Sequence, residues 1–284
     1  MLTAKLSIQN KVYHLQSLIT DQKEISSGYF RLIFSAPQIA QIAQPGQFVH
    51  IYCGEGTYLR RPFSIAKVKK NQVEIIYKVV GKGTELLSRK KKGNTLDVLG
   101  PLGNGFTQSL NHPITQSPIL IAGGTGVASL LFLAQKLITL YTSHLTPLTV
   151  FLGAKTKNDL LCIDNFKKLG CQVKLATEDG SLGYKGLVTD LFRNSLITHN
   201  SSLITNIYAC GPYAMLKEIA KITQKYKIPY QVSLEAMMAC GLGACRGCVV
   251  KTSHQSLTTS HQHFVYKTVC KDGPVFEANQ IIWE

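Results

Sequence analysis

Hydrophobic and polar residues alternate with two different periods along this chain, and the change falls near residue 117. Before that point, short runs rich in β-branched and aromatic residues are separated by Gly, Pro, Lys and Asn. Such runs predict strands, here at residues 6–18, 29–34, 47–52, 64–68 and 73–80. Short strands at regular spacing are typical of a small antiparallel barrel. We expect this barrel domain to span residues 1–108, with an irregular glycine-rich loop at 100–106.

Beyond residue 117, short continuous apolar runs alternate with helical patterns. Residues 118–122 are typical of a buried strand, and residues 127–141 predict a mostly apolar helix. Further elements are predicted as strands at 148–154, 173–177 and 207–209 and as a helix around 159–169. This alternation favours an α/β domain with a parallel sheet, which we expect over residues 109–230. Residues 231–284 are left for a small C-terminal module.

A glycine loop joins the first strand of the α/β domain to the first helix. Its sequence is Gly123, Gly124, Thr125 and Gly126. A helix N-terminus preceded by bare amides is an arrangement that receives a phosphate group. The loop does not match G-x-G-x-x-G, so the standard dinucleotide fingerprint is absent. The residues at 178–181 and 210–215 follow later strands, and we expect all these strand ends to line one site.

The barrel half carries a basic run and a small-residue turn that could face a phosphorylated cofactor. The run Arg61, Pro62, Phe63 and Ser64 combines a fixed cation with a hydroxyl and backbone N–H groups. Further on, Tyr77 and Lys78 precede a turn that contains Gly83 and Thr84. On local chemistry alone, an ordinary hairpin with basic turns explains these residues as well as a cofactor site does.

Three cysteines near the C-terminus are spaced C-x4-C-x2-C, namely Cys240, Cys245 and Cys248. This is the plant-type spacing for a [2Fe–2S] cluster, whose fourth thiolate comes from farther along the chain. Cys270 stands in the expected position for that ligand. Glycines between the cysteines allow peptide N–H groups to point at sulfur. The spacing therefore favours an iron–sulfur cluster.

A zinc site and a disulfide framework stay open as alternative roles for the cysteines at this point. A structural zinc site usually shows a second C-x2-C pair, which is missing, although His254, His261 and His263 lie between Cys248 and Cys270. A disulfide framework needs an oxidising compartment, of which the sequence gives no sign. We expect residues 252–263 to form a polar surface loop with solvent-facing histidines.

Composition sets the class of protein but leaves its partner open. The chain has 284 residues, 45% of them hydrophobic, which is enough for two domains and a small module. Its 31 Lys and Arg against 16 Asp and Glu give a net charge of +15. The only dense basic run, at residues 89–92, lacks interleaved aromatic residues for stacking on bases. We therefore expect no nucleic acid, and a solvated basic face that could meet an acidic partner.

The chain shows no targeting or membrane segment that we recognise. The first residues lack a basic region followed by an apolar run, as a secretory signal would have. The longest uncharged stretch, residues 113–135, has the glycine loop in its middle, which favours a buried strand and helix over a membrane span. We expect a cytoplasmic protein without a membrane span.

Three motifs together resemble the ferredoxin reductase superfamily, which pairs an FAD-binding barrel with an NAD(P)-binding α/β domain. They are residues 61–64, 123–128 and 210–215, in that order. Residues 233–241, the cysteine cluster and residues 269–276 narrow the resemblance. The whole chain is similar to the electron-transfer subunits of class B dihydroorotate dehydrogenases. The implied fold is multidomain β + α/β, with an antiparallel FAD-binding barrel, a parallel-sheet NAD-binding domain and a small C-terminal [2Fe–2S] module.

The resemblance also assigns residues to cofactors. FAD would be bound by Arg61, Pro62, Phe63, Ser64, Ile76, Tyr77, Lys78, Gly83 and Thr84. The pyrophosphate of NAD would lie on Gly123, Gly124, Thr125 and Gly126, with Cys210 and Gly211 near the nicotinamide and flavin rings. Cys210 is the one candidate catalytic residue. The cluster ligands would be Cys240, Cys245, Cys248 and Cys270. Ser129 departs from the superfamily, which often has proline at this position.

The activity implied by the resemblance is an electron relay in pyrimidine (UMP) biosynthesis. A class B catalytic subunit carrying FMN would oxidise dihydroorotate, and electrons would pass through the [2Fe–2S] cluster and FAD to NAD+. Two subunits of each kind would form a heterotetramer. Glu178 and Asp179 end a predicted strand near the expected adenosine ribose, and carboxylates there favour NAD over NADP.

Two alternative functions have different partners. A related reductase subunit would pass electrons from NAD(P)H to another acceptor, such as ferredoxin or a sulfur compound. A zinc-stapled basic binding module would instead explain the cysteines together with the positive charge. A purified protein with yellow-brown colour would exclude the zinc module.

Overall fold

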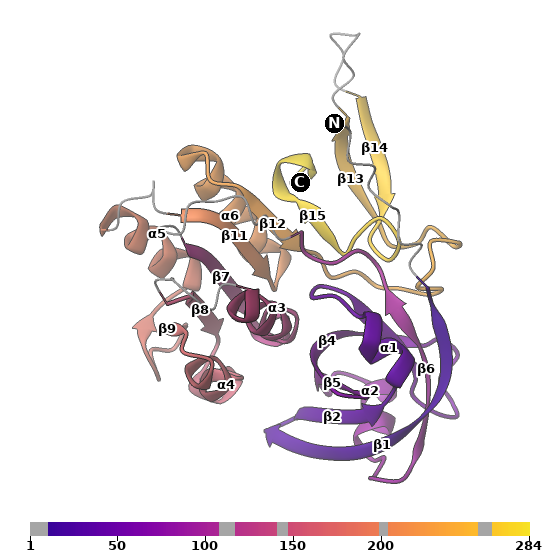
Figure 1. The fold of residues 1–284 in the computed structure, drawn as a ribbon. Helices are drawn as coiled ribbons and strands as arrows, with labels where there is room; N and C mark the ends of the chain where they lie inside the picture. Colours follow the sequence, from indigo (N-terminus) through magenta and orange to yellow (C-terminus); the bar gives the residue numbers. More distant parts are fainter. Residues whose placement is uncertain (1–10, 108–116, 141–146, 199–203, 255–262) are drawn as a thin grey trace.

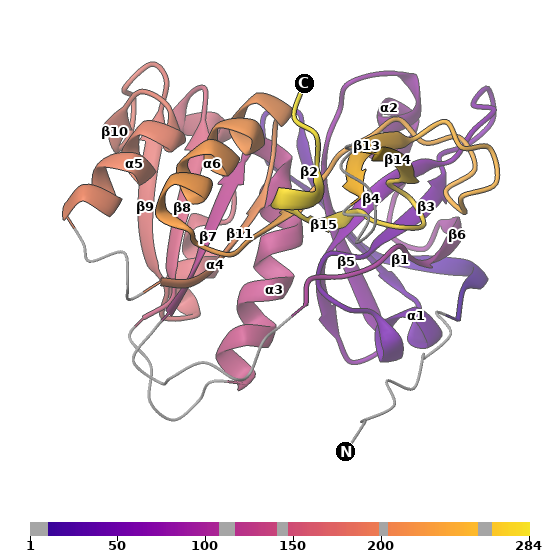
Figure 2. The same ribbon diagram turned by 90° about the horizontal axis from the view of Figure 1, so that it is seen from above.

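The computed structural model describes residues 11–107, 117–140, 147–198, 204–254 and 263–284. These residues form a closed six-stranded barrel, a seven-stranded sheet covered by helices, and a two-stranded hairpin (Figure 1). Seen from above, the barrel and the helix-covered sheet lie side by side, with the C-terminal strand between them (Figure 2). The predicted fold class, an antiparallel barrel followed by a parallel-sheet region and a small C-terminal segment, is therefore confirmed.

The barrel is antiparallel throughout, with the strand order β1-β2-β5-β4-β3-β6. Its strands are β1 (Tyr13–Ser26), β2 (Tyr29–Ser35), β3 (Phe48–Tyr52), β4 (Arg61–Lys69), β5 (Gln72–Lys78) and β6 (Thr95–Leu102). Two short helices, α1 (Pro37–Ile42) and α2 (Lys82–Ser88), interrupt the strands. Successive side chains of a strand face opposite sides, so Val49 and Ile51 of β3 fill the barrel core. Phe48 faces outward and packs with residues of the C-terminal segment.

Two predictions for the barrel are wrong in position. The first strand does not run over 6–18, because residues 13–26 pair with β2 and β6 and residues 1–10 lie outside the described part. The predicted loop at 100–106 begins too early, because Gly100, Pro101 and Leu102 complete β6. A Cβ at Gly100 would lie only 2.9 Å from Val49 Cγ1, so the close packing of β6 on β3 requires a glycine here.

The seven-stranded sheet has the order β10-β9-β8-β7-β11-β12-β15 and is parallel except for its last pair. Its strands are β7 (Ser117–Gly123), β8 (Thr149–Ala154), β9 (Gln172–Thr177), β10 (Tyr184–Lys185), β11 (Ile204–Cys210), β12 (Tyr230–Ser233) and β15 (Val275–Glu277). The central strands β7 and β8 are mostly apolar, as expected for strands that have helices on both faces. Ile121 packs with α5 (Val188–Thr198) and α6 (Tyr213–Tyr226), whereas Leu120 packs with α3 (Val127–Leu140) and α4 (Ile163–Lys168).

Helix α3 joins the two large parts of the molecule. It lies between the parallel sheet and the barrel in Figure 1, and it packs against β4. Phe132 on this helix belongs to the barrel core, while Leu130 and Leu133 pack with the sheet. The mostly apolar sequence of α3 is therefore explained by its burial on two sides, against the sheet and against the barrel. This contact fixes the glycine loop at the start of α3 relative to strands β4 and β5 of the barrel.

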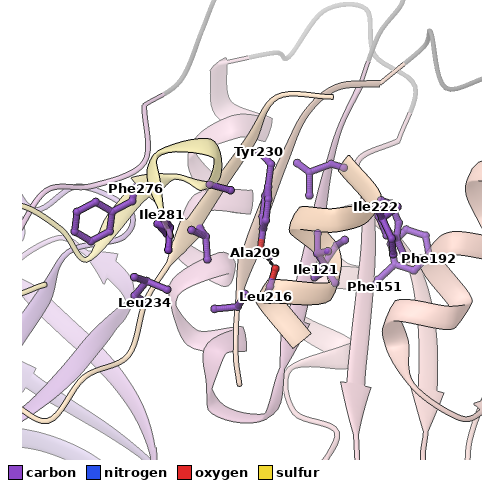
Figure 3. Close-up of a cluster of buried hydrophobic side chains, with 14 of the residues drawn as sticks. Ile121, Phe151, Phe192, Ala209, Leu216, Ile222, Tyr230, Leu234, Phe276 and Ile281 are labelled. Carbon is purple, nitrogen blue, oxygen red and sulfur yellow. Dashed lines mark hydrogen bonds between the residues drawn. The ribbon is translucent and has the colours of Figure 1, made fainter. Parts of the chain in front are cut away.

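The C-terminal segment shares its core with the α/β region. The apolar cluster in Figure 3 runs from Phe192 through Ala209 and Tyr230 to Phe276 and Ile281. Strand β15 pairs antiparallel with β12 and extends the sheet. The hairpin of β13 (Val249–His254) and β14 (His263–Thr268) stands apart from it, and η4 (Ala278–Gln280) follows β15. The cluster loop, residues 238–248, therefore emerges from a shared packed core.

Two further predictions need correction. The helix expected at 159–169 is shorter, because Cys162 has a positive φ of 62° and α4 begins only at Ile163, after the single turn η2 (Lys157–Asp159). The expected loop at 252–263 begins and ends as strand, since His254 pairs with His263 across the β13–β14 hairpin. His261 and the rest of 255–262 lie outside the described residues. No helix among the described residues is long and apolar enough to cross a membrane.

Candidate functional site

A cavity of about 380 Å³ lies where the barrel, the parallel sheet and the C-terminal segment meet. It brings together most of the residues that the resemblance assigned to FAD, one assigned to the pyrophosphate of NAD and one assigned to the nicotinamide region. Those in its wall are Arg61, Pro62, Phe63, Ser64, Ile76, Tyr77, Lys78, Thr84, Thr125 and Cys210. The C-terminal segment adds Ser233, Glu235 and Met238. We call this the flavin cavity, after the cofactor that the resemblance assigns to these residues.

Strands β4 and β5 pair side by side and supply seven of the eighteen residues that line the flavin cavity. The guanidinium of Arg61 donates to the carbonyl oxygen of Leu59 at 2.7 Å, which holds it on its own strand. Gly83 does not line the cavity; a Cβ there would lie 3.2 Å from Arg61 Nε, so the glycine leaves room for this cation. The Thr84 hydroxyl accepts from the backbone N–H groups of Val80 and Gly81. The cavity therefore offers cations, a hydroxyl and aromatic rings within a rigid frame.

Cys210 ends β11 inside the flavin cavity and is 2% exposed. Burial raises the pKa of its thiol to about 12, with the nearby Glu235 carboxylate acting in the same direction and Ser233 opposing it. The thiol is therefore protonated near neutral pH. Such a group can pack against a ring or donate a hydrogen bond, but it is not the thiolate that nucleophilic catalysis requires.

A second cavity, of about 650 Å³, opens at the carboxyl ends of the parallel strands. Its wall includes Gly123, Gly124 and Lys78 from the predicted set, together with residues that follow β8, β9 and β11. These loops thus line one site, as the positions of the strand ends predict. Gly124 has a φ of +53° and open space where a side chain would be, so its backbone is accessible. We call this the dinucleotide cavity.

Gly126 and Gly211 support the dinucleotide cavity without lining it. A Cβ at Gly126 would fall onto the carbonyl oxygen of Cys210, and one at Gly211 would lie 2.9 Å from the backbone nitrogen of Gly123. Both glycines are therefore needed where the loop after β7 touches the loop after β11. This contact holds the dinucleotide cavity next to Cys210 in the flavin cavity.

Charged side chains in the dinucleotide cavity are arranged differently from the sequence-based expectation. Glu178 lines the wall, as predicted. Asp179 instead accepts hydrogen bonds from the backbone N–H and hydroxyl of Ser181, at 2.9 and 2.7 Å, so it stabilises a turn. Arg193 is held between two carboxylates, with 2.8 Å to Asp190 and 2.6 Å to Glu218. Its charge is already neutralised by the protein.

A polar contact crosses between the barrel and the α/β region at the edge of the dinucleotide cavity. The Tyr29 hydroxyl of β2 donates to Asp159 at 2.9 Å, and the Lys78 ammonium lies 3.6 Å from the same carboxylate. Lys78 also lies 4.7 Å from the centre of the Tyr29 ring. Thr156 donates to the second carboxylate oxygen of Asp159. These residues form an interdomain network beside the larger packing contact of α3.

The four predicted cluster ligands lie in one loop and the turn that follows β14. Backbone N–H groups point at their sulfur atoms: Leu242 and Cys245 donate to Cys240 Sγ at 3.4 Å, and Gly243 donates to Cys270 Sγ at 3.1 Å. The Cys270 N–H donates to Cys248 Sγ at 3.4 Å. The side chains form two neighbouring pairs, Cys240 with Cys245 and Cys248 with Cys270.

The thiols differ in their acidity because their surroundings differ. Burial acts to raise the pKa of Cys240, but the N–H groups of Cys245 and Leu242 outweigh it and lower the value to about 6. Burial and the adjacent Cys248 thiol raise the pKa of Cys270 to about 12. Within the described residues, no three His, Cys, Asp or Glu side chains surround a single metal position. A binuclear cluster, in which each iron takes two thiolates, fits two pairs.

Sequence reasoning missed several residues of the site. Ser233, Glu235 and Met238 lie in a run that was used to identify the family, so their position next to that motif was the available signal. Tyr29 and Asp159 carried no sequence signal. Nor did His50, which is 1% exposed on β3 and has no hydrogen-bond partner on either ring nitrogen among the described residues. Burial, with the cations Arg60 and Arg61, lowers the pKa of His50 to about 4.

Family models match two parts of the chain. Residues 235–282 match the iron–sulfur cluster binding domain of dihydroorotate dehydrogenase B. Residues 120–221 match the oxidoreductase NAD-binding domain. The first match contains the cluster loop and all four cysteines, and the second contains the glycine loop at the start of α3.

Solved structures with similar folds include several flavin-dependent reductases. The NADH-dependent reduced ferredoxin-NADP oxidoreductase superimposes with a TM-score of 0.79 and 32% identity, covering 95% of this chain and 90% of that one. A ferredoxin NADP+ reductase from Neisseria gonorrhoeae, with bound FAD and NADP, gives a TM-score of 0.62 at 16% identity, over 75% of this chain and 91% of that one. The second likeness shows the fold alone.

Three relatives that match over nearly the whole chain carry the same name. The dihydroorotate dehydrogenase B (NAD(+)) electron transfer subunit of Desulforamulus reducens is 41% identical, covering 92% of this chain and 95% of that protein. Its counterpart in Caldanaerobacter subterraneus subsp. tengcongensis is 35% identical over 95% of this chain and 99% of that protein. The one from Bacillus cereus strain Q1 is 38% identical over 93% and 97%. The chain therefore belongs to the family of dihydroorotate dehydrogenase B (NAD(+)) electron transfer subunits.

Proposed function

We propose that this chain is the electron-transfer subunit of an NAD-dependent dihydroorotate dehydrogenase of class B. It carries electrons from an FMN-containing catalytic subunit to NAD+, in the synthesis of pyrimidine nucleotides. The observation that carries the proposal is the composition of the flavin cavity. Its wall takes Arg61 from the barrel, Cys210 from the α/β region and Met238 from the cluster loop, two residues before Cys240. One cavity thus touches all three sites that such a relay needs.

The flavin cavity fits FAD by the chemistry of its donors. The Arg61 and Lys78 cations suit a pyrophosphate, and the Ser64 hydroxyl and neighbouring N–H groups suit the polar edge of a flavin ring. When bound, FAD exchanges electrons singly or in pairs, and a [2Fe–2S] cluster transfers them singly. The protein orients the ring, and the protonated Cys210 thiol covers the cavity at the end of β11. A side chain at position 83 would crowd the Arg61 guanidinium, so Gly83 leaves the space that this cation occupies.

The dinucleotide cavity fits NAD because its backbone is open where a pyrophosphate needs amide donors. Gly123, Gly124, Thr125 and Gly126 form this loop at the start of α3, and Gly211 lets the opposite loop approach. Glu178 supports a preference for NAD, since a carboxylate accepts from a ribose hydroxyl and repels a phosphate. Arg193 supports the same preference, because both its neighbouring carboxylates already hold its guanidinium.

The cluster loop fits a [2Fe–2S] centre by its donor set. Cys240 and Cys245 would bind one iron, and Cys248 and Cys270 the other. Four backbone N–H groups already point at the sulfur atoms, as the hydrogen bonding around such clusters requires. The lowered pKa of Cys240 favours the thiolate that metal binding needs.

The division of the chain and its assembly belong to the same proposal. The FAD-binding barrel would span residues 1–108, the NAD-binding domain 109–230 and the cluster module 231–284. Strand β15 supports a close attachment of the module, because it completes the sheet of the NAD-binding domain. The catalytic subunit is the required partner, in a cytoplasmic heterotetramer with two subunits of each kind.

The test is to isolate the native complex through this chain without oxygen and to add dihydroorotate in the absence of nicotinamide. We expect the visible bands of flavin and cluster to bleach, and the reduced complex to transfer hydride to NAD+ in preference to NADP+. A complex that retains its partner but responds only to NADH would contradict the proposal. Equal catalytic efficiency with NADH and NADPH would contradict only the proposed role of Glu178 in selecting NAD.

A second function has one observation in its favour. The likeness to the NADH-dependent reduced ferredoxin-NADP oxidoreductase covers nearly the whole chain at 32% identity. A subunit that serves ferredoxin or another acceptor would use the same three sites. The partner that copurifies with the chain distinguishes the two functions, because a dihydroorotate-oxidising subunit must carry FMN and bind dihydroorotate.

A further inference from the structure

We propose that His50 is a positioning residue that fixes the peptide between Cys240 and Gly241 against the flavin barrel and thereby tunes the cluster at its Cys240 end. The inference rests on the proposed function, since it requires the cluster. It assigns a task to a barrel side chain that belongs to neither the flavin cavity nor the ligand set.

The burial of His50 is unusual for its chemistry. The side chain is 1% exposed, and neither Nδ1 nor Nε2 has a hydrogen-bond partner among the described residues. Buried polar groups in proteins nearly always have a partner, and an exception calls for an explanation. Its neighbours on the same strand, Val49 and Ile51, are apolar and fill the barrel core. Since side chains alternate along a strand, His50 faces away from that core, on the same side as Phe48, which packs with the C-terminal segment.

The ring of His50 faces the cluster loop. A Cβ placed on Gly241 would lie 2.6 Å from His50 Nδ1 and 3.0 Å from Cε1, so the imidazole occupies the space beside this glycine. The backbone groups of Cys240 and Arg60 both lie near the ring, although neither makes a hydrogen bond of normal geometry with it. On its own strand, His50 pairs with Pro62 of the flavin strand β4. One residue thus links the flavin strand to the peptide that follows the first cluster ligand.

This contact controls a hydrogen bond to sulfur. Leu242, the residue after Gly241, donates its N–H to Cys240 Sγ at 3.4 Å. A small shift of Gly241 would move that N–H away from the sulfur. N–H donors withdraw electron density from thiolate ligands, and their loss lowers the reduction potential of an iron–sulfur cluster. His50 therefore acts through Gly241 and Leu242, at the end of the cluster nearest the barrel.

The first test replaces His50 by leucine and by asparagine in the native complex. We expect His50→Leu to keep its FAD, to lower the midpoint potential of the cluster, to change its EPR spectrum and to slow electron transfer by about tenfold to a hundredfold. His50→Asn places an amide near the position of Nδ1, and we expect it to restore most of the potential. Ile51→Val, which alters a core-facing neighbour, is the matched control and should leave the EPR spectrum unchanged.

A second pair of variants protects the test from a folding failure of His50→Leu. Gly241→Ala pushes a methyl group into the ring and should reproduce the altered EPR spectrum in a protein with normal FAD content. Combined with His50→Ala, which makes space for that methyl group, it should disturb the spectrum less than it does alone. Gly241 has a φ of +71°, so the backbone strain of an alanine there is the same in both backgrounds, and only the relief that His50→Ala gives reports on the ring. The absence of any relief would overturn the contact between His50 and Gly241.

The outcomes separate this inference from the function on which it rests. A wild-type complex that lacks a [2Fe–2S] spectrum would overturn both. A wild-type complex that bleaches with dihydroorotate, while His50→Leu has an unchanged cluster potential and EPR spectrum, would overturn only the role of His50. A lowered potential that asparagine restores would support it, because a smaller polar side chain would not restore a role in which His50 only fills space.

Discussion

The two cofactor-binding halves of the molecule are built in different ways. The flavin and dinucleotide cavities lie on strands and helices whose cores are fully buried, as Ile65 in the barrel and Val150 in the sheet illustrate. Residues 234–248, which carry three of the four cluster cysteines, contain no helix or strand. Cys245 is exposed, and Arg246 has a positive φ of 54°. Strands and helices position the flavin and dinucleotide cavities, whereas hydrogen bonds to sulfur position the cysteines of the cluster loop.

This structural difference indicates that the sites are stabilised by different interactions. The flavin and dinucleotide cavities inherit their shape from apolar packing that exists without any cofactor. The cluster loop buries few side chains of its own, so the free energy of metal binding must contribute to its order. Removing a ligand should therefore disorder the loop and leave the other two sites in place. Each of the following predictions tests one side of this contrast.

The largest effect is expected from Cys245→Ser. The substitution removes an exposed thiolate from the loop, and we expect loss of the [2Fe–2S] spectrum and a fall of more than about a hundredfold in electron transfer with the partner's flavin. FAD content should stay near that of the wild type, because no residue of the flavin cavity changes. The measurements are the visible and EPR spectra, the flavin content and the rate at which dihydroorotate reduces the FAD of this chain in the complex.

Cys171→Ala is the control for Cys245→Ser, since this buried thiol belongs to the core of the α/β region. It should keep the cluster and lose only some stability. Loss of FAD together with the cluster in Cys245→Ser would break the contrast between the two halves. It would mean that the loop, through Met238, forms a structural wall of the flavin cavity.

A smaller effect is expected in the rigid half from Gly126→Ala. The new methyl group would meet the carbonyl oxygen of Cys210, which is backbone and cannot rotate away. Overpacking of this kind costs about 1–3 kcal/mol of unfolding free energy. Because the clash separates the two loops that line the dinucleotide cavity, KM for NADH should also rise. Denaturant unfolding and steady-state kinetics measure the two effects, and the cluster spectrum should not change.

Gly81→Ala provides the matched comparison for Gly126→Ala. Gly81 has an extended φ of 173° and open space where the methyl group would be, so its replacement should cost less than about 0.5 kcal/mol. If the two variants lose equal stability, the close contact of Gly126 with Cys210 is not what holds the loops together.

Much of the fold could be predicted from the sequence because it rests on local patterns. The continuous apolar run of β7 and the helix after it fixed the α/β region, and the C-x4-C-x2-C spacing indicated the cluster loop. Where prediction failed, a contact distant in sequence decided the structure. Residues 20–26 are polar except for Ile25 yet form strand because they pair with β2, and Gly100 belongs to β6 because it pairs with Tyr13 of β1.

The candidate site was predictable where a motif carries its own chemistry. The glycine loop and the cysteine spacing were found in this way, whereas the residues of β4 and β5 were assigned only by the family resemblance; the structure brings most of the assigned FAD and NAD residues into two cavities. Residues that act through tertiary contacts were not found. His50 and Tyr29 are single residues in ordinary strands, and only the fold brings them to Gly241 and Asp159. No local pattern distinguishes them from their neighbours.

The smallest effect is expected at the network between Tyr29, Asp159 and Lys78, which joins the two parts of the rigid half. Burial acts to raise the pKa of Asp159, but hydrogen bonds from Thr156 and Tyr29 and the Lys78 charge outweigh it, so the pKa is lowered from its ordinary value of 3.8. Lys78 is 44% exposed, and solvent screening limits such a pair to less than about 1 kcal/mol. Asp159→Asn should therefore cost no more than that at neutral pH.

The pH dependence of this small loss decides what holds the barrel to the α/β region. A carboxylate with a lowered pKa in the folded state contributes stability above its ordinary pKa, and the contribution disappears as the pH falls through the lowered value. The unfolding free energies of the wild type and Asp159→Asn should thus differ by a constant above about pH 5 and converge below 3.8. Asp164→Asn, an exposed carboxylate of α4, should show no such difference. A constant difference that persists into acid would assign the loss to changed packing at Tyr29, and the apolar face of α3 would then be sufficient to join the two parts.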